Sequence, residues 1–326
     1  MSKPVPTMTP GLFRETFEAV VANIGRVIKG KDPVVRTVVI CVLADGHVLL
    51  EDLPGTGKTM LARSLAQSID AGTSRIQCTP DLLPSDVTGS SVIDLQTRQF
   101  TFRPGPVFTN ILLTDEINRA TPKTQSALLE AMQERNVTVD GVTHHLPRPF
   151  LMIGTQNPIE LAGTFPLPEA QLDRFMFKLS LGYADIEAEI EVLDSNYSQE
   201  AIESLQPVCT LEDVLAMQEW ARGVEASAEV KRYIAELVQA TRHDASLLLP
   251  ASTRASLAMM RAARVVAASS GREDVMPDDV QAIIKPVLAH RISLTPDAEL
   301  RDETIDKVID RLLNRVKPPI GVRTSA

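Results

Sequence analysis

A short glycine-rich segment, Pro54-Gly55-Thr56-Gly57-Lys58-Thr59, holds the residues of this sequence that are best suited to chemistry. Its glycines permit the positive-φ turns that point successive backbone N–H groups inward, around an anion. The lysine can then reach the β- and γ-phosphates of a nucleotide, and the threonine hydroxyl after it can ligate Mg2+. We therefore predict an ATP site formed by Pro54, Gly55, Thr56, Gly57, Lys58, Thr59 and Met60.

One position departs from the usual form of such a loop. The pattern places a glycine five residues before Gly57, where this chain has Asp52. A carboxylate about 4 Å from a triphosphate would cost roughly 1–4 kcal/mol at surface-like dielectric constants. Because position 52 lies where the preceding strand is expected to end, we expect the side chain of Asp52 to turn away from the phosphates.

A second candidate group is the acidic pair Asp115-Glu116, which follows the apolar run 111–114. Open α/β sheets bind their ligands at the carboxyl ends of the strands. At that edge Asp115 would hold Mg2+ together with Thr59, and Glu116 would polarise an attacking water as general base. A strand that merely ends in a solvated acidic pair is the alternative, and the phosphate loop earlier in the chain argues against it.

These residues can meet only if strands and helices alternate around them. The apolar run 47–51 predicts a buried strand that leads into the glycine loop, and a helix is expected at 60–69. A helix at 122–134 has Thr121 as its N-cap. Helices at 12–25 and after Pro33 come first, and further strands are predicted at 75–78, 111–114, 150–155 and 175–179. The fold class is therefore α/β, with a parallel sheet.

Two stretches interrupt this alternation. Residues 87–106 form a long insertion, in which Phe100 and Phe102 are expected to pack against the rest of the chain. Residues 137–146 alternate in polarity around Asp140-Gly141, which predicts a β-hairpin with a type I′ turn.

After Tyr183 we predict helices alone, at 185–195, 211–222, 228–243, 253–269, 278–291 and 302–316. The expected domain organisation is an α/β domain over residues 1–183, followed by an all-helical domain over residues 184–326.

Composition and charge limit the classes of protein. The 326 residues are 44% hydrophobic, which is typical of a folded chain, and the net charge of −9 argues against coating nucleic acid or anionic membrane. The three cysteines and five histidines show no metal-ligand or redox spacing. No apolar run is long enough to cross a bilayer, so we expect a cytoplasmic protein without direct membrane insertion.

Three strings resemble the MoxR family of AAA+ ATPases, and the likeness extends over about residues 20–316. They are Asp115-Glu116-Ile117-Asn118-Arg119-Ala120 with its continuation to Met132, Gly154-Thr155-Gln156-Asn157-Pro158, and residues 165–175. The family also accepts Asp at position 52. The resemblance implies an AAA+ P-loop domain followed by a helical lid, and magnesium-dependent ATP hydrolysis in a homo-oligomeric ring, usually a hexamer. It further implies chaperone-like remodelling or maturation of a protein with a von Willebrand factor A domain.

The resemblance also implies roles for three residues that the sequence alone would leave as a turn, a surface ion pair and a solvated side chain. Asn157 corresponds to the sensor-one residue that helps to orient the attacking water. Arg174 corresponds to the arginine finger that reaches the γ-phosphate of the neighbouring subunit, with Arg119 as a second candidate. Arg254 corresponds to the sensor-two arginine, through which the lid detects the nucleotide. The insertions at 87–106 and 137–146 would engage a client.

Two other functions remain open at this stage. One is a slow nucleotide switch that recruits a partner without doing work, against which Glu116, Asn157 and Arg174 argue together. The other is a chelatase-like ATPase subunit or a nucleic-acid motor of a related clade. The acidic net charge disfavours the motor, and no nucleic acid is expected as a partner.

Overall fold

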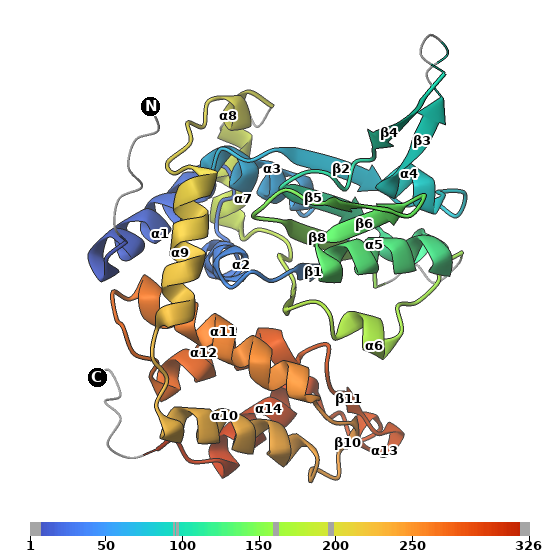
Figure 1. Ribbon diagram of the computed structural model, residues 1–326. Coiled ribbons are helices and arrows are strands. Elements are labelled where there is room, and N and C mark those ends of the chain that lie inside the picture. The colour runs from blue at the N-terminus through green and yellow to red at the C-terminus, as the bar shows by residue number, and fades with distance from the viewer. Residues whose placement is uncertain (1–7, 94, 96–97, 159–162, 195–198, 320–326) are drawn as a thin grey trace.

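A parallel five-stranded sheet organises the first half of the computed structural model, which describes residues 8–93, 95, 98–158, 163–194 and 199–319 (Figure 1). The strand order is β2-β5-β8-β1-β9, and every neighbouring pair is parallel. The strands are β1 (Val48–Glu51), β2 (Thr73–Gln77), β5 (Ile111–Asp115), β8 (Leu151–Gln156) and β9 (Phe177–Leu179). All five predicted strands are therefore present, with ends that differ by one or two residues.

The sheet brings three segments of the predicted site to one edge. Strand β1 runs directly into the glycine loop, and it pairs in parallel with β8, which pairs in parallel with β5. The carboxyl ends of β1, β5 and β8 consequently open at the same side of the sheet. Helix α3 (Lys58–Ser68) follows the loop, and α5 (Pro122–Glu134) begins after its N-cap Thr121, whose hydroxyl accepts from the Thr124 amide.

The helices of the second half share one apolar core with the N-terminal helices. Helices α1 (Pro10–Gly25) and α2 (Asp32–Leu43) pack against α9 (Leu211–Gly223) and α11 (Thr253–Ser269). A single cluster of buried side chains runs from Phe13 in α1 through the sheet to Ile309. The remaining helices of the second half are α7 (Ile186–Asp194), α8 (Gln199–Glu203), α10 (Ala228–Thr241), α12 (Pro277–Leu288), α13 (Pro296–Glu299) and α14 (Ile305–Arg315).

The prediction of helices alone after Tyr183 is wrong at one place. Strand β10 (Leu247–Leu249) pairs antiparallel with the two-residue strand β11 (Ser293–Leu294). Strands this short show no periodicity, and their pairing partner lies more than forty residues away along the chain. Only the packing of the helices around them brings the two segments together.

Both insertions are β-hairpins. After α4 (Pro84–Thr88), strands β3 (Gly89–Ile93) and β4 (Phe100–Pro104) form an arm that projects from the body (Figure 1). Strands β6 (Asn136–Val139) and β7 (Val142–His145) form the second, with positive φ at Asp140 and Gly141, as a type I′ turn requires.

The expectation for the phenylalanines of the first insertion is half confirmed. The Phe102 ring stacks on His144 of the second hairpin, with 3.8 Å between ring centroids, so the two insertions touch. Phe100 is 76% exposed and does not pack against the chain as expected. Phe100 pairs with Ile93, two residues further along the arm than Phe102, whose ring contacts Phe108 and His144.

Candidate nucleotide site and arginine cavity

The glycine loop has the backbone that phosphate binding requires. Gly55 and Gly57 have φ values of 82° and 90°, and α3 begins at Lys58 directly after them. An added Cβ at either glycine would meet no other atom within 4 Å, so the positive φ is what demands glycine there and the space beside it is open. The loop and the start of α3 border a cavity of about 400 Å3, lined by Pro54, Gly55, Thr56, Gly57, Lys58, Thr59, Met60, Arg75, Gln77, Asp115, Glu116, Thr155 and Asn157.

Asp52 turns away from this cavity, as expected. Its carboxylate is buried and accepts three hydrogen bonds, from the Ser180 hydroxyl (2.7 Å) and the amides of Leu181 (2.8 Å) and Gly182 (2.9 Å). These donors hold the segment that follows β9 against the end of β1. The aspartate therefore closes the base of the loop and does not confront the phosphates.

The ammonium group of Lys58 contacts the glycine loop. Its Nζ donates to the carbonyl oxygens of Asp52 (3.0 Å) and Leu53 (3.2 Å), which belong to the same turn. Both acceptors are neutral, so an anionic phosphate oxygen is the stronger acceptor for this ammonium group.

Asp115 ends β5 with two partners in the cavity. The Arg75 guanidinium, from the neighbouring strand β2, donates from Nε to Oδ2 over 2.6 Å. The Thr155 hydroxyl, from the strand on the other side, donates to Oδ1 over 3.3 Å. A cationic group therefore already lies against Asp115, and the Thr59 hydroxyl lines the same cavity. Hydroxyl and carboxylate oxygens are the ligands that Mg2+ prefers, so the residues present fit that ion.

Glu116 is held by its backbone and by its neighbours. It adopts a left-handed conformation with φ 54° and ψ 51°, and its amide donates to the Thr155 hydroxyl over 2.9 Å. Its Oε2 accepts from Gln77 Nε2 (2.9 Å) and from Arg119 Nη1 (3.0 Å). Arg119 thus contacts the glutamate of its own chain.

Arg174 and Arg254 lie away from the glycine loop. Arg174 stands three residues before β9, and Val48 at the start of β1 pairs with Phe177 at the start of β9. Both arginines line a second cavity together with Gly46 and His47, which precede β1. The four residues of β1 span about 13 Å between this cavity and the glycine loop. Of the residues carried over from the family, the structure brings Asn157 to the loop and places Arg174 and Arg254 at the opposite edge of the sheet.

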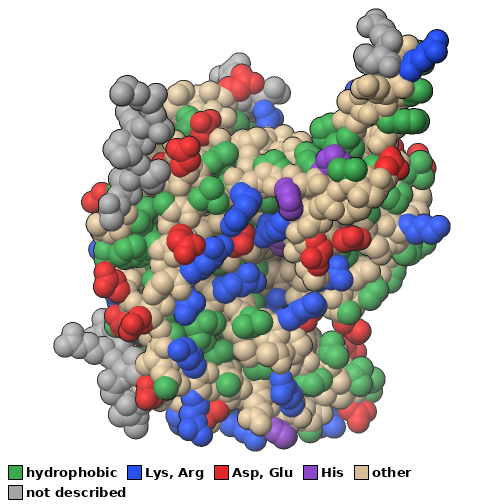
Figure 2. All heavy atoms as spheres, viewed as in Figure 1, with side chains coloured by type: hydrophobic (Ala, Val, Ile, Leu, Met, Phe, Trp, Pro, Cys, Tyr) green, Lys and Arg blue, Asp and Glu red, His purple; other side chains and the backbone are tan. Residues whose placement is uncertain are grey.

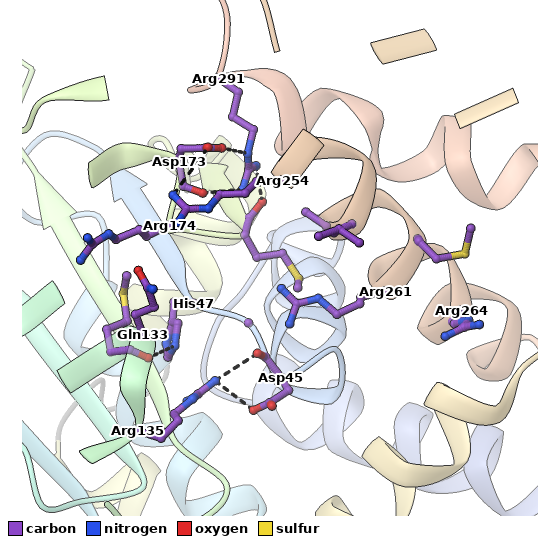
Figure 3. A pocket seen from close by; sticks show the side chains of 16 residues that line it. Asp45, His47, Gln133, Arg135, Asp173, Arg174, Arg254, Arg261, Arg264 and Arg291 are labelled. Carbon is purple, nitrogen blue, oxygen red and sulfur yellow. Dashed lines mark hydrogen bonds and ion pairs between the residues drawn. The ribbon is translucent and has the colours of Figure 1, made fainter. Parts of the chain in front are cut away.

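The second cavity is rich in arginine (Figure 3). It has a volume of about 650 Å3 and is lined by Arg135, Arg174, Arg254, Arg261, Arg264 and Arg291, against only two carboxylates, Asp45 and Asp173. On the face shown in Figure 2, basic side chains gather in the middle, between the sheet and the helices below it. Burial, with Arg261 nearby, lowers the pKa of Arg135 and of Arg291. We call this site the arginine cavity.

Sequence reasoning missed Arg75, Gln77 and Arg291. The first two alternate along β2 beside Asp115, so polar side chains at alternate positions near the carboxyl end of a neighbouring strand were a usable signal. Arg291 follows α12 and is buried against Asp173, more than a hundred residues away, and it had no local signal.

Comparisons with known proteins show the family of the chain. Residues 47–177 match the model of the ATPase family associated with various cellular activities (AAA), and residues 239–312 match the AAA lid domain. Chaperone MoxR1 of Mycobacterium tuberculosis is 40% identical, over 96% of this chain and 86% of that protein. The chain belongs to the MoxR family of AAA+ ATPases.

Other relatives of this MoxR-family chain extend over similar lengths. The uncharacterized protein YeaC of Bacillus subtilis is 48% identical, over 92% of this chain and 94% of its own. The crystal structure of a candidate ATPase from Cytophaga hutchinsonii superposes with a TM-score of 0.87 at 38% identity, covering 95% of this chain and 97% of that one. The α/β AAA+ fold with a helical lid is thereby confirmed. Arg254 and Arg291 both fall within the matched lid segment.

The described residues also limit other kinds of site. No helix among them has both the length and the apolar character needed to cross a membrane. They contain no group of three or more His, Cys, Asp or Glu side chains arranged to hold a metal ion. Cys41, Cys78 and Cys209 are buried free thiols, and burial raises the pKa of Cys78 to about 12.

Proposed function

We propose that the chain hydrolyses ATP with Mg2+ in a homo-oligomeric ring, with each nucleotide contacted by Arg174 and Arg254 of the next subunit. The observation that carries this proposal is the separation of these arginines from the glycine loop by the length of β1. In an interface that joins one edge of the sheet to the opposite edge of a second copy, the two half-sites would meet, and such head-to-tail contacts form a ring when the rotation between copies closes. By resemblance to the family, six copies form that ring.

The residues at the glycine loop would divide the work. Lys58 would move from the loop carbonyls to the phosphates, and the amides of the loop and of the α3 start would surround them. Thr59 and Asp115 would hold Mg2+, which neutralises charge that develops on the phosphates. Arg75 would leave Asp115 when the ion binds.

Glu116 would take the proton of the attacking water. Gln77 and Arg119 hold its carboxylate at 2.9 and 3.0 Å, and Asn157, which follows β8 and lines the same cavity, would orient the water. Arg174 and Arg254 of the neighbour would stabilise the negative charge of the transition state, an effect worth orders of magnitude in turnover for a finger supplied in trans.

The work done with this ATP is proposed to be chaperone-like maturation of a partner protein, with a von Willebrand factor A domain protein as the client that the family resemblance implies. A relative in this family carries the name chaperone. The projecting arm supports a client-binding role, because Val92, Ile93, Leu95 and Phe100 expose apolar side chains on it. A slow nucleotide switch and a chelatase-like subunit are the competing functions.

ATP turnover per subunit, measured across a wide range of protein concentration with Mg2+ present, tests the central proposal. A rate that rises steeply with concentration and then saturates is expected, because each active site needs two chains. Absence of turnover at every concentration, with and without a candidate client, would favour the switch. A constant rate from a protein that sediments as a monomer throughout would overturn the shared site.

A further inference from the structure

Three arginines of the arginine cavity have no carboxylate to neutralise them. In the described part of the chain, Asp45 pairs with Arg135, and Asp173 pairs with Arg291 and approaches Arg254, whereas Arg174, Arg261 and Arg264 form no ion pair. The Nε atoms of Arg174 and Arg264 are buried without a hydrogen-bond partner. Buried polar groups are normally satisfied, so these atoms indicate that an anionic partner completes the site.

The arginine side chains extend along α11 well beyond Arg254, the residue of this helix proposed to contact the nucleotide. Arg254, Arg261 and Arg264 lie on one side of this helix, and ten residues at 1.5 Å each put the two outer ones about 15 Å apart. A smaller cavity of about 170 Å3 continues past Arg261 and Arg264 to Arg222. The same side of α11 exposes Leu257, which is 61% accessible. We call Leu257, Arg261 and Arg264 the α11 stripe.

The chain carries the complementary surface on α7. Residues 185–191 contain Asp185, Glu187, Glu189 and Glu191 and no basic residue. Ile186, one turn before Ile190, is 72% exposed, and Ile190 is exposed as well. An apolar pair beside exposed carboxylates is what a surface needs to cover Leu257 and neutralise arginines.

The position of α7 places this surface at the edge of the sheet that carries the glycine loop. The Gly182 amide, four residues before α7, donates to Asp52 at the base of the loop over 2.9 Å. Lys29, in the segment between α1 and α2, approaches Glu191 within 3.5 Å. The α7 surface and the α11 stripe therefore lie at opposite edges of one chain, as the two halves of a head-to-tail interface do.

We propose that α7 of one copy packs against the α11 stripe of the next, with Glu187 and Glu189 facing Arg261 and Arg264. This inference rests on the proposed ring and deepens it, because it adds a protein–protein contact beside the contact between Arg174 and the nucleotide. A second copy is the occupant that the surfaces favour, since the chain itself supplies both the matching charge and the matching apolar side chains.

Charge reversal on each side tests the contact. The variants Arg261→Glu/Arg264→Glu and Glu187→Arg/Glu189→Arg should each raise the protein concentration needed for assembly roughly tenfold or more, because close interfacial charge pairs couple strongly. The chain that carries all four changes should regain assembly, since the opposite charges again face each other. Sedimentation velocity with a non-hydrolysable ATP analogue gives the readout. Arg232→Glu, at an exposed site on α10, is the matched control and should assemble normally.

Two further measurements keep the outcome decisive. Each variant is first checked for the spectrum of the folded protein. If either double variant unfolds, the chain carrying Glu187→Cys and Arg264→Cys replaces the charge reversal. A short bismaleimide is then expected to link these two cysteines between neighbouring copies. The contact would be overturned if the chain with all four charge changes assembled no better than the two double variants. It would also be overturned if the two cysteines did not crosslink between copies. Stabilisation of the wild-type monomer by inorganic triphosphate, lost in Arg261→Glu/Arg264→Glu, would instead assign the cavity to a soluble anion.

The proposed ring can fail independently of this contact. Rescue of Arg174→Ala subunits by mixing with Glu116→Gln subunits reports on the shared active site alone. Rescue of turnover in the mixture, without recovery of assembly in the chain with all four charge changes, would support the ring and exclude α7 from its interface. Absence of both results would contradict the ring itself.

Discussion

The guanidinium of Arg291, three residues after α12, lies 2.7 Å from the carboxylate of Asp173, the residue next to Arg174. The Arg291 side chain is only 3% exposed and also donates to the carbonyl oxygens of Phe175 and Met176. Ser252 adds a hydrogen bond of 2.9 Å to the same aspartate. A buried ion pair from the lid therefore holds the segment that carries the proposed finger, so the position of the lid and the position of Arg174 are coupled.

Breaking this pair should destabilise the protein. In Asp173→Asn, the buried Arg291 would lose its counter-charge, and we expect the free energy of unfolding to fall by about 3 kcal/mol or more. Chemical denaturation measures it. Glu236→Gln, which breaks the exposed pair with Arg232 on α10, is the control and should change stability by no more than about 0.5 kcal/mol. Equal effects of the two changes would show that the Asp173 pair is not a structural link.

Removing the loop lysine should abolish tight nucleotide binding. Lys58→Ala loses the ammonium that reaches the phosphates, and charge-assisted hydrogen bonds of about 1.5–3 kcal/mol correspond to a loss of roughly ten- to a hundredfold in affinity. Fluorescent ATP titration provides the measurement, and Lys123→Ala at an exposed position of α5 is the control. Wild-type affinity in Lys58→Ala would mean that the nucleotide binds elsewhere.

Neutralising the proposed general base should separate binding from turnover. Glu116→Gln keeps the size of the side chain but cannot take a proton, so turnover should fall about a hundredfold or more while ATP affinity is retained. Glu130→Gln, exposed on α5, should behave as wild type. Undiminished turnover in Glu116→Gln would assign the base to another residue.

Mixing subunits should reveal whether Arg174 acts on a neighbour. Arg174→Ala alone should be inactive, but in an equal mixture with Glu116→Gln about a quarter of interfaces would combine an intact glutamate with an intact finger. Partial recovery of turnover is therefore expected, whereas Arg174→Ala mixed with Lys58→Ala/Arg174→Ala should recover nothing. A mixture with Glu116→Gln that stays silent would contradict action in trans.

Two buried histidines should make the fold sensitive to acid. Burial lowers the pKa of His290 to about 3, and it lowers the pKa of His47 well below 6.5. As the pH falls, these histidines bind protons in the unfolded chain before they do so in the folded protein. Their contribution to stability is therefore fully present above about pH 6.5 and is lost on acidification from there toward pH 3. The slope is at most about 1.4 kcal/mol per pH unit for each histidine. Denaturation midpoints from pH 7.5 to 5 measure it, and His243→Gln, at an exposed position, should leave the slope unchanged.

The sequence by itself determined the local parts of the nucleotide site. These parts are the glycines around Lys58, the strand before them and the acidic end of β5. Each depends on residues only a few positions apart, so the local patterns predicted both the elements and their proposed roles. The turn of Asp52 away from the phosphates was predictable as well, because a strand end leaves room for it. The division of the chain at residue 183 stays a prediction.

Tertiary structure alone decided which of these parts can meet. The alternation of Arg75 and Gln77 marks polar positions along β2, but only the strand order, which packing sets, brings Arg75 to Asp115. The same holds for the pairing of β10 with β11. It also holds for the separation of Arg174 and Arg254 from the glycine loop, since a parallel strand sends its two ends to opposite edges of the sheet. The sequence specified the residues of the glycine loop, and the fold placed Arg174 and Arg254 at the other end of β1.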